Sequence, residues 1–205
     1  AVLTTGAVKC WGLNTNGQLG DNTTVQKLVP TAVSGIDGTA AKATVIAVGA
    51  SHTCALITDG SVRCWGLNTS GQLGDNTLVQ KLIPTTVKAT ATTNLTGVTA
   101  ITAGAAHTCA IVGSGATATA KCWGSNANGR LGNAATTNSS LPVAVVVTLT
   151  TGVTAIVAGG SHTLALVPSV TLAPKAGAAW GLNTNGQLGD ASTTQRTSPV
   201  VLGLL

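Results

Sequence analysis

The chain has 205 residues, of which 44% are hydrophobic, 7% are charged and 2% are aromatic, with a formal net charge of +5. Abundant apolar residues with so little charge exclude intrinsic disorder, and a set of five acidic residues and three His leaves little material for general acid–base catalysis. The basic excess comes from ten cations, none adjacent to another, unlike the dense Lys/Arg stripe of a nucleic-acid-binding protein. We therefore expect neither an enzyme nor a nucleic-acid binder.

Two sequence markers recur with the same spacing. A Gly-x-x-His-Thr marker and a Trp-Gly-x-Asn-x-x-Gly-x-Leu-Gly marker alternate along the chain. The first begins at Gly49, Gly104 and Gly159, and the second begins at Trp11, Trp65, Trp123 and Trp180. Two independent markers with one period of about 55 residues indicate a repeat architecture. The sequence divides into a truncated repeat at 1–44 and repeats at 45–97, 98–152 and 153–205, about 3.7 units in a single array.

The elements within one repeat are all predicted to be β-strands. In the second repeat, short apolar runs occupy 45–48, 53–57, 61–65 and 84–87, and Gly, Asn, Asp or Pro separates them. No segment keeps an apolar period of 3.6 residues, so helices should be few and short. Four short antiparallel strands per unit are typical of a β-propeller blade, which predicts an all-β propeller array. The most apolar stretch, 141–160, contains Thr and Gly and matches repeat strands, so we expect no membrane span.

The second repeat carries the combination Gly49-x-x-His52-Thr53-Cys54-Ala55-Leu56, followed by Asp59-Gly60 and by Cys64-Trp65-Gly66-x-Asn68-x-x-Gly71-Gln72-Leu73-Gly74-Asp75. This combination resembles the RCC1 (regulator of chromosome condensation) repeat, and the resemblance extends over essentially the whole chain. It implies a β-propeller that in this family typically has seven blades, of which this sequence holds about half.

The cysteines follow the repeat register. If residues 58–60 form a three-residue hairpin loop, Cys54 faces Cys64 across two strands, at a distance that suits a disulfide. Cys109 and Cys122 occupy the same positions around a longer loop, which predicts a second disulfide. The alternative is that these residues are reduced, buried thiols.

The fourth repeat supports the disulfide interpretation. Leu164 and Ala179 replace both partners together, as expected for bonded pairs. Cys10 matches Cys64, and its own partner would stand immediately before Ala1. Because disulfides persist in oxidising compartments, we expect an extracellular or cell-surface protein.

The histidines and tryptophans are expected to be structural. A catalytic centre is singular, whereas these residues stand at one repeat position each. We expect the imidazoles of His52, His107 and His162 to bridge backbone groups of the blades. We expect Trp11, Trp65, Trp123 and Trp180 to be the large core residue of each blade, rather than surface residues for stacking.

The Asn-Gly-Leu-Gly loops are expected to be tight turns, with no metal or cofactor. Each offers at most one carboxylate, from Asp21, Asp75 or Asp190, and Asn133 replaces it in the third repeat, so calcium is not expected. No helix follows to form a phosphate cradle. N-glycosylation sequons begin at Asn22, Asn68, Asn94 and Asn138.

The function we predict is that of a non-enzymatic extracellular scaffold, which assembles with copies of itself or with other parts of a longer surface protein as a fibre or surface layer. The variable segments 34–44, 88–96, 113–120 and 168–178 carry no aromatic anchors. A secreted binding module (adhesin, lectin or inhibitor) is the alternative. A guanine-nucleotide exchange factor, implied by the family name, fits less well because that role needs a charged surface and a reducing compartment.

Overall fold

The computed structural model describes residues 1–146, 152–167 and 176–202, so most of the variable segment 168–178 lies outside the described residues. The described chain is all-β, apart from one 3-10 turn at Gly115–Thr117, as the sequence predicts. The strands form one two-stranded and three four-stranded antiparallel sheets, which are called blades 1 to 4 below.

Each blade follows the chain order, so that sequence neighbours are also hydrogen-bonded neighbours. Blade 1 holds β1 (Ala7–Gly12) and β2 (Lys27–Asp37). Blade 2 holds β3 (Ala43–Val48), β4 (His52–Ile57), β5 (Val62–Gly66) and β6 (Lys81–Thr86). Blade 3 holds β7 (Val98–Ala103), β8 (His107–Val112), β9 (Thr119–Gly124) and β10 (Ser139–Ala144). Blade 4 holds β11 (Ala155–Ala158), β12 (His162–Val167), β13 (Ala176–Gly181) and β14 (Arg196–Val201).

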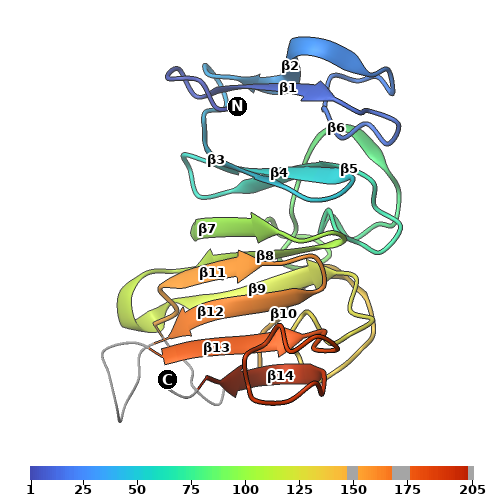
Figure 1. Cartoon of the computed structure of the whole chain (residues 1–205). Helices are drawn as coiled ribbons and strands as arrows, with labels where there is room; N and C mark the ends of the chain where they lie inside the picture. Colours follow the sequence, from blue (N-terminus) through green and yellow to red (C-terminus); the bar gives the residue numbers. More distant parts are fainter. Residues whose placement is uncertain (147–151, 168–175, 203–205) are drawn as a thin grey trace.

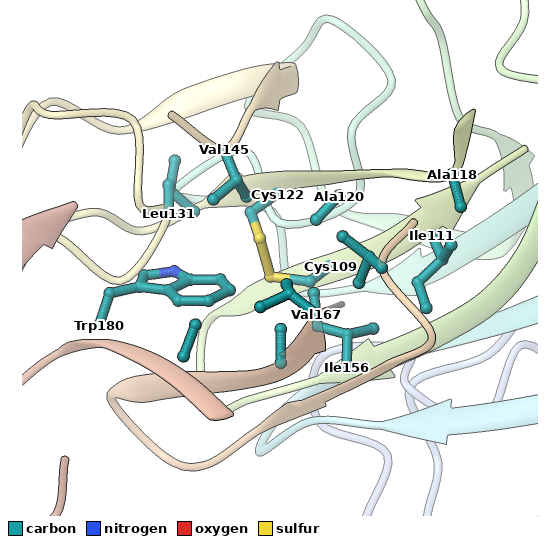
Figure 2. Close-up of a cluster of buried hydrophobic side chains, with 13 residues drawn as sticks. Cys109, Ile111, Ala118, Ala120, Cys122, Leu131, Val145, Ile156, Val167 and Trp180 are labelled. Atoms are coloured by element: carbon teal, nitrogen blue, oxygen red, sulfur yellow. A yellow bond between two sulfur atoms is a disulfide. The ribbon is translucent and has the colours of Figure 1, made fainter. Parts of the chain in front are cut away.

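The blades stack face to face in sequence order, with blade 1 and blade 4 at opposite ends of the stack (Figure 1). Each blade buries its apolar faces against the neighbouring blades, as expected for a repeat protein. Three buried clusters fill the spaces between consecutive blades. Figure 2 shows the cluster between blades 3 and 4, where Trp180 and Val167 lie beside the Cys109–Cys122 disulfide.

The hairpin register in blade 2 is the one that the sequence predicts. Cys54 pairs with Cys64, and Ala55 pairs with Arg63. The two predicted disulfides, Cys54–Cys64 and Cys109–Cys122, are both present. In blade 4 the same register places Leu164 opposite Ala179.

Blade 1 contains only the equivalents of the last two strands of a four-stranded blade, which are called the outer strands. The first two strands of blades 2 to 4 are called the inner strands. By repeat register, β1 corresponds to β5 and β2 to β6. Beside β1, Ala1 and Lys9 exchange backbone hydrogen bonds, and Val2 pairs with Val8. Among the described residues, Cys10 is the one free cysteine, and its side chain is half-buried. In the described part of the chain, no helix is long and apolar enough to cross a membrane.

Candidate functional site

The repeated His and Thr residues form links between consecutive blades. His52 Nε2 lies 3.0 Å from Oγ1 of Thr108, in the next blade, and His107 Nε2 lies 3.0 Å from Oγ1 of Thr163. The prediction that the imidazoles bridge backbone groups is therefore wrong in its choice of partner. The partner is a threonine side chain, because β4 and β8 bring the His of one blade opposite the Thr of the next.

The hydrogen-bond directions fix the tautomer of these histidines. Thr108 Oγ1 donates its single proton to the Gln72 carbonyl at 2.9 Å, so it must accept from His52 Nε2–H. His52 Nδ1 is then an acceptor, and it has no partner among the described residues. Burial lowers the pKa of His52 to about 4 and that of His107 to about 3, so both rings are neutral at pH 7.

His162 occupies the same repeat position at the open face of blade 4. Its side chain is only partly buried, because none of the described blades covers this face. Burial lowers its pKa as well. The three histidines are thus equivalent in sequence but not in environment.

Three of the four tryptophans are buried beneath a loop of the preceding blade. Trp65, Trp123 and Trp180 are at most 1% exposed. The indole N–H of Trp123 donates to the Gln72 carbonyl at 3.0 Å. Gly74 lies directly over this ring: a Cβ atom there would be 2.7 Å from Nε1, and its φ of +67° favours glycine.

Trp11 contradicts the prediction that every Trp is a core residue, because its side chain is 50% exposed. The loop that would cover it belongs to a blade preceding blade 1, and none of the described residues takes that place. Beside β1, a cavity of about 310 Å³ is lined by Trp11 and Cys10 and by the inner strand residues Ile46 and Val48 of blade 2. In blades 2 to 4 this position holds the two inner strands of the blade.

In each Asn loop, hydrogen bonds from the side chain of the first Asn hold the loop closed. The Asn loops are residues 14–21, 68–75, 126–133 and 183–190. Asn68 is fully buried, and its Oδ1 accepts the Leu73 N–H at 3.0 Å. Its Nδ2 contacts four acceptors, including Asp75 Oδ1 at 3.0 Å and the Thr77 carbonyl at 3.1 Å. Glycosylation of Asn68 is therefore incompatible with this fold, because the nitrogen that would carry the glycan is buried and bonded. The sequon residues Asn22, Asn94 and Asn138 are exposed.

An ion pair completes three of these loops. Lys27 lies 3.2 Å from Asp21, Lys81 lies 3.5 Å from Asp75, and Arg196 lies 2.7 Å from Asp190. Hydrogen bonds from Ser192, Arg196 and Asn183 lower the pKa of Asp190 to about 2. The sequence analysis missed these pairs, although each cation follows its Asp by six residues.

The third loop departs from this pattern. Arg130 replaces the Gln found in the other loops, Asn133 replaces the Asp, and Ser139 replaces the cation. Arg130 is 7% exposed, and its Nε has no hydrogen-bond partner among the described residues. Elsewhere in the described chain, no group of three or more His, Cys, Asp or Glu residues is arranged to hold a metal ion.

The Regulator of chromosome condensation (RCC1) repeat model matches residues 5–56, 59–111 and 122–166. The chain belongs to the RCC1 repeat family. It is 32% identical over 200 residues to the Ultraviolet-B receptor UVR8 of Arabidopsis thaliana, an alignment that covers 98% of this chain and 42% of the receptor. Its length thus corresponds to less than half of this relative.

Solved structures show the same RCC1 propeller fold. Human WBSCR16 matches with a TM-score of 0.82 and 23% identity, over 99% of this chain and 50% of that chain. Yeast RCC1 (Prp20), solved with Kap60 bound, matches with a TM-score of 0.79 and 21% identity, over all of this chain and 47% of that chain. Domains of this kind are mainly non-enzymatic binding or regulatory modules.

Proposed function

We propose that this chain is a non-catalytic, extracellular scaffold segment that assembles through its open blade 1 with further RCC1-type strands. These strands come from the rest of a longer surface protein or from a second copy. The observation that carries the proposal is the cavity beside Cys10, at the place where the inner strands of the other blades lie. The half-buried Cys10 thiol corresponds to the bonded Cys64. An incoming strand whose Cys in this register arrives as a mixed disulfide with a small thiol would bond to Cys10 by exchange, with release of that thiol.

The extracellular location is supported by the two disulfides. Cytosolic thiols are kept reduced, whereas secreted domains keep such bonds. The low charge of the chain also favours close packing of apolar and Thr-rich surfaces over a charged contact.

A strand-complementation experiment tests the assembly. A synthetic peptide with the sequence of residues 98–109 carries β7 and the part of β8 up to Cys109, from the inner strands of blade 3. It stops there because residues 1–3 already pair beside β1 at the positions equivalent to 110–112. With Cys109 of the peptide supplied as its mixed disulfide with glutathione, we expect the Cys10 thiolate to displace glutathione as a thiol and to form the Cys10–Cys109 disulfide. The bound peptide should also protect Trp11, which lines the cavity, from acrylamide quenching. The matched controls are a peptide with Cys109→Ser and a protein with Cys10→Ser. Failure of the peptide with Cys109 to bind, together with a native protein that is a stable monomer in light scattering, would contradict the proposal.

A second candidate function is a secreted binding module, and one observation favours it. Large apolar side chains are exposed at the outer rim of blades 1 and 2, namely Val25, Leu28, Val29, Leu78, Val79 and Ile83. The equivalents of Val25 and Val79 in blades 3 and 4 are Thr137 and Thr194. Such an asymmetric apolar patch is typical of a protein-binding surface.

The two functions are separable by a rim variant. Val25→Thr combined with Val79→Thr gives blades 1 and 2 the side chains of blades 3 and 4. If the rim binds a partner, this variant loses that partner in a pull-down from the producing cell's surface and keeps its folding and its assembly. Unchanged capture of that partner would exclude the rim.

A further inference from the structure

The third Asn loop lacks a side-chain acceptor that the other three loops have. In the other loops the Gln side chain accepts from the residue two positions earlier: Gln18 Oε1 accepts from Asn16 N–H at 2.8 Å, and Gln72 Oε1 accepts from Ser70 N–H at 2.9 Å. Gln187 does the same for Asn185 at 2.9 Å. Arginine has no acceptor atom, so Arg130 leaves the N–H of Asn128 without this partner.

The same side chain carries a positive charge, and none of the described residues forms an ion pair with it. Arg130 Nη2 donates to Asn128 Oδ1 at 2.6 Å, which is a neutral acceptor. All five Asp residues lie in the described part of the chain, and the chain has no Glu. Three of these Asp residues pair with Lys27, Lys81 and Arg196, and none lies within ion-pair distance of Arg130.

The backbone holds this loop in place. The Arg130 carbonyl accepts from Trp180 Nε1 at 2.9 Å and from Thr163 Oγ1 at 3.0 Å, both in blade 4. The loop of blade 3 is therefore anchored to blade 4 across the junction of the two blades. A buried charge without a partner is strongly unfavourable, so a ligand that supplied an acceptor would be bound there.

We propose that Arg130 and the Asn128 N–H bind a carboxylate of a protein partner, an Asp or Glu side chain or a chain terminus. This inference goes beyond both functions proposed above, because Arg130 lies in blade 3, away from the open blade 1 and from the apolar rim of blades 1 and 2. The two oxygens of a carboxylate match one guanidinium and one amide donor. One positive charge balances one carboxylate, whereas a phosphate group with about −1.5 to −2 charge would remain half-neutralised. Arg130 Nε is itself buried, so the carboxylate would contact the 7% of the Arg130 surface that stays exposed.

The test follows the Asn128 amide and the Arg130 Nε–H by NMR in the full protein during titration with acetate, against sodium chloride at equal ionic strength. We expect saturable shifts of both signals with acetate. Arg130→Gln restores the Gln found in the other three loops, so it should fold, and we expect it to weaken acetate binding at least tenfold. Arg130→Lys keeps the charge but not the paired geometry, and we expect intermediate binding.

Lys121→Gln is the control, because it removes a positive charge from blade 3 outside the loop. It should leave the shifts unchanged. Equal loss in Lys121→Gln and Arg130→Gln would show diffuse charge attraction and overturn the proposal, as would tighter binding of inorganic phosphate than of acetate. Acetate binding does not require assembly through blade 1. The titration therefore tests the Arg130 site independently of the scaffold function.

Discussion

The hydroxyl of Thr108 joins groups from two blades. It accepts from the imidazole of His52 and donates to the Gln72 carbonyl, which also accepts from Trp123. All of these groups are fully buried or nearly so. A buried polar group without a partner is strongly unfavourable. A His at position 52 therefore requires a hydrogen-bond acceptor at position 108, which the Thr108 hydroxyl provides.

Replacing Thr108 with Val keeps the shape of the side chain and removes its hydroxyl. We expect the free energy of unfolding to fall by about 1–3 kcal/mol, because the His52 N–H is left buried without an acceptor. Urea unfolding measures this. Thr93→Val, at an exposed position, is the control and should change stability little. If the two variants lose the same amount, the His–Thr link is not a stabilising contact.

Stability should also depend on pH through these histidines. The pKa of His52 is about 4 in the folded protein, and an unfolded His has a pKa of about 6.5. As the pH falls below 6.5, the unfolded state gains a proton that the folded state does not. Stability should therefore be full above pH 6.5 and fall by about 3 kcal/mol per buried His as the pH approaches 4.

Urea midpoints between pH 7 and pH 4.5 test this pH dependence. This window lies above the one in which Asp190, with a pKa of about 2, takes up its proton. The variant His52→Asn should show a shallower loss of stability over the same range. A slope equal to that of the parent protein would contradict the assignment to His52.

The β4–β5 and β8–β9 hairpins are closed by disulfides, whereas the β12–β13 hairpin carries Leu164 opposite Ala179. The fourth blade thus shows which apolar pair fills the same space without a bond. The bond constrains the unfolded chain, so its removal should destabilise the fold even where packing is kept.

The double variant Cys109→Leu and Cys122→Ala copies the pair of blade 4 into blade 3. We expect it to lower the free energy of unfolding by about 3 kcal/mol, through the lost constraint on a short loop. Reduction should have less effect on this variant than on the parent. The control is Cys10→Ser, which breaks no bond in the described chain. Equal stability of the double variant and the parent under oxidising conditions would be evidence against a stabilising disulfide.

The inner turns that precede β4, β8 and β12 pack closely against one another. A Cβ atom at Gly104 would lie 2.2 Å from the His107 ring and 2.4 Å from the Gly159 carbonyl of the next blade. The glycine is required here by the close approach of the His ring and the next backbone. The chain signals this only through the recurrence of Gly three residues before His.

Gly104→Ala should therefore destabilise the junction of blades 3 and 4 by about 3 kcal/mol, because a rigid backbone atom stands in the way. The neighbouring Gly160 provides the matched control. A Cβ atom added there would meet no atom within 4 Å, and blades 2 and 3 have Ala50 and Ala105 at this position. Gly160→Ala should be neutral in thermal unfolding. Similar losses in both variants would exclude the contact with His107 as the cause.

Among the described blades, blades 1 and 4 each have one face that no other blade covers. Blade 1 presents the exposed Trp11 and the cavity beside Cys10, and blade 4 presents the partly buried His162. Each residue is fully buried at the equivalent position of blades 2 and 3. Exposed groups of this kind favour assembly with another blade.

We expect Trp11→Ser to change the unfolding free energy by less than about 1 kcal/mol, as is usual for an exposed side chain. The equivalent variant Trp123→Ser should lose about 3–5 kcal/mol, because it empties a buried site. From the proposed assembly through blade 1, we expect Trp11→Ser to raise the protein concentration needed for association, as measured by light scattering. If Trp11→Ser and the parent protein associate at the same concentration, Trp11 is not part of the association interface.

The local pattern determined the features that depend on residues close in sequence. The two markers defined the repeats, and the Asp59-Gly60 turn set the register that places Cys54 opposite Cys64. The paired replacement by Leu164 and Ala179 identified the bonded pairs. These inferences succeeded because a hairpin fixes its pairs through short-range turn geometry and strand alternation.

Only the tertiary structure decided what each repeated residue contacts in the neighbouring blade. Repetition predicted four equivalent tryptophans, but Trp11 is exposed because no described blade covers it. It likewise predicted backbone partners for His52, whereas the partner is Thr108, 56 residues away. The isolation of Arg130 emerged only from the positions of all five Asp residues. Burial and pairing depend on what the fold brings within a few ångströms, and strand alternation carries no information about that distance.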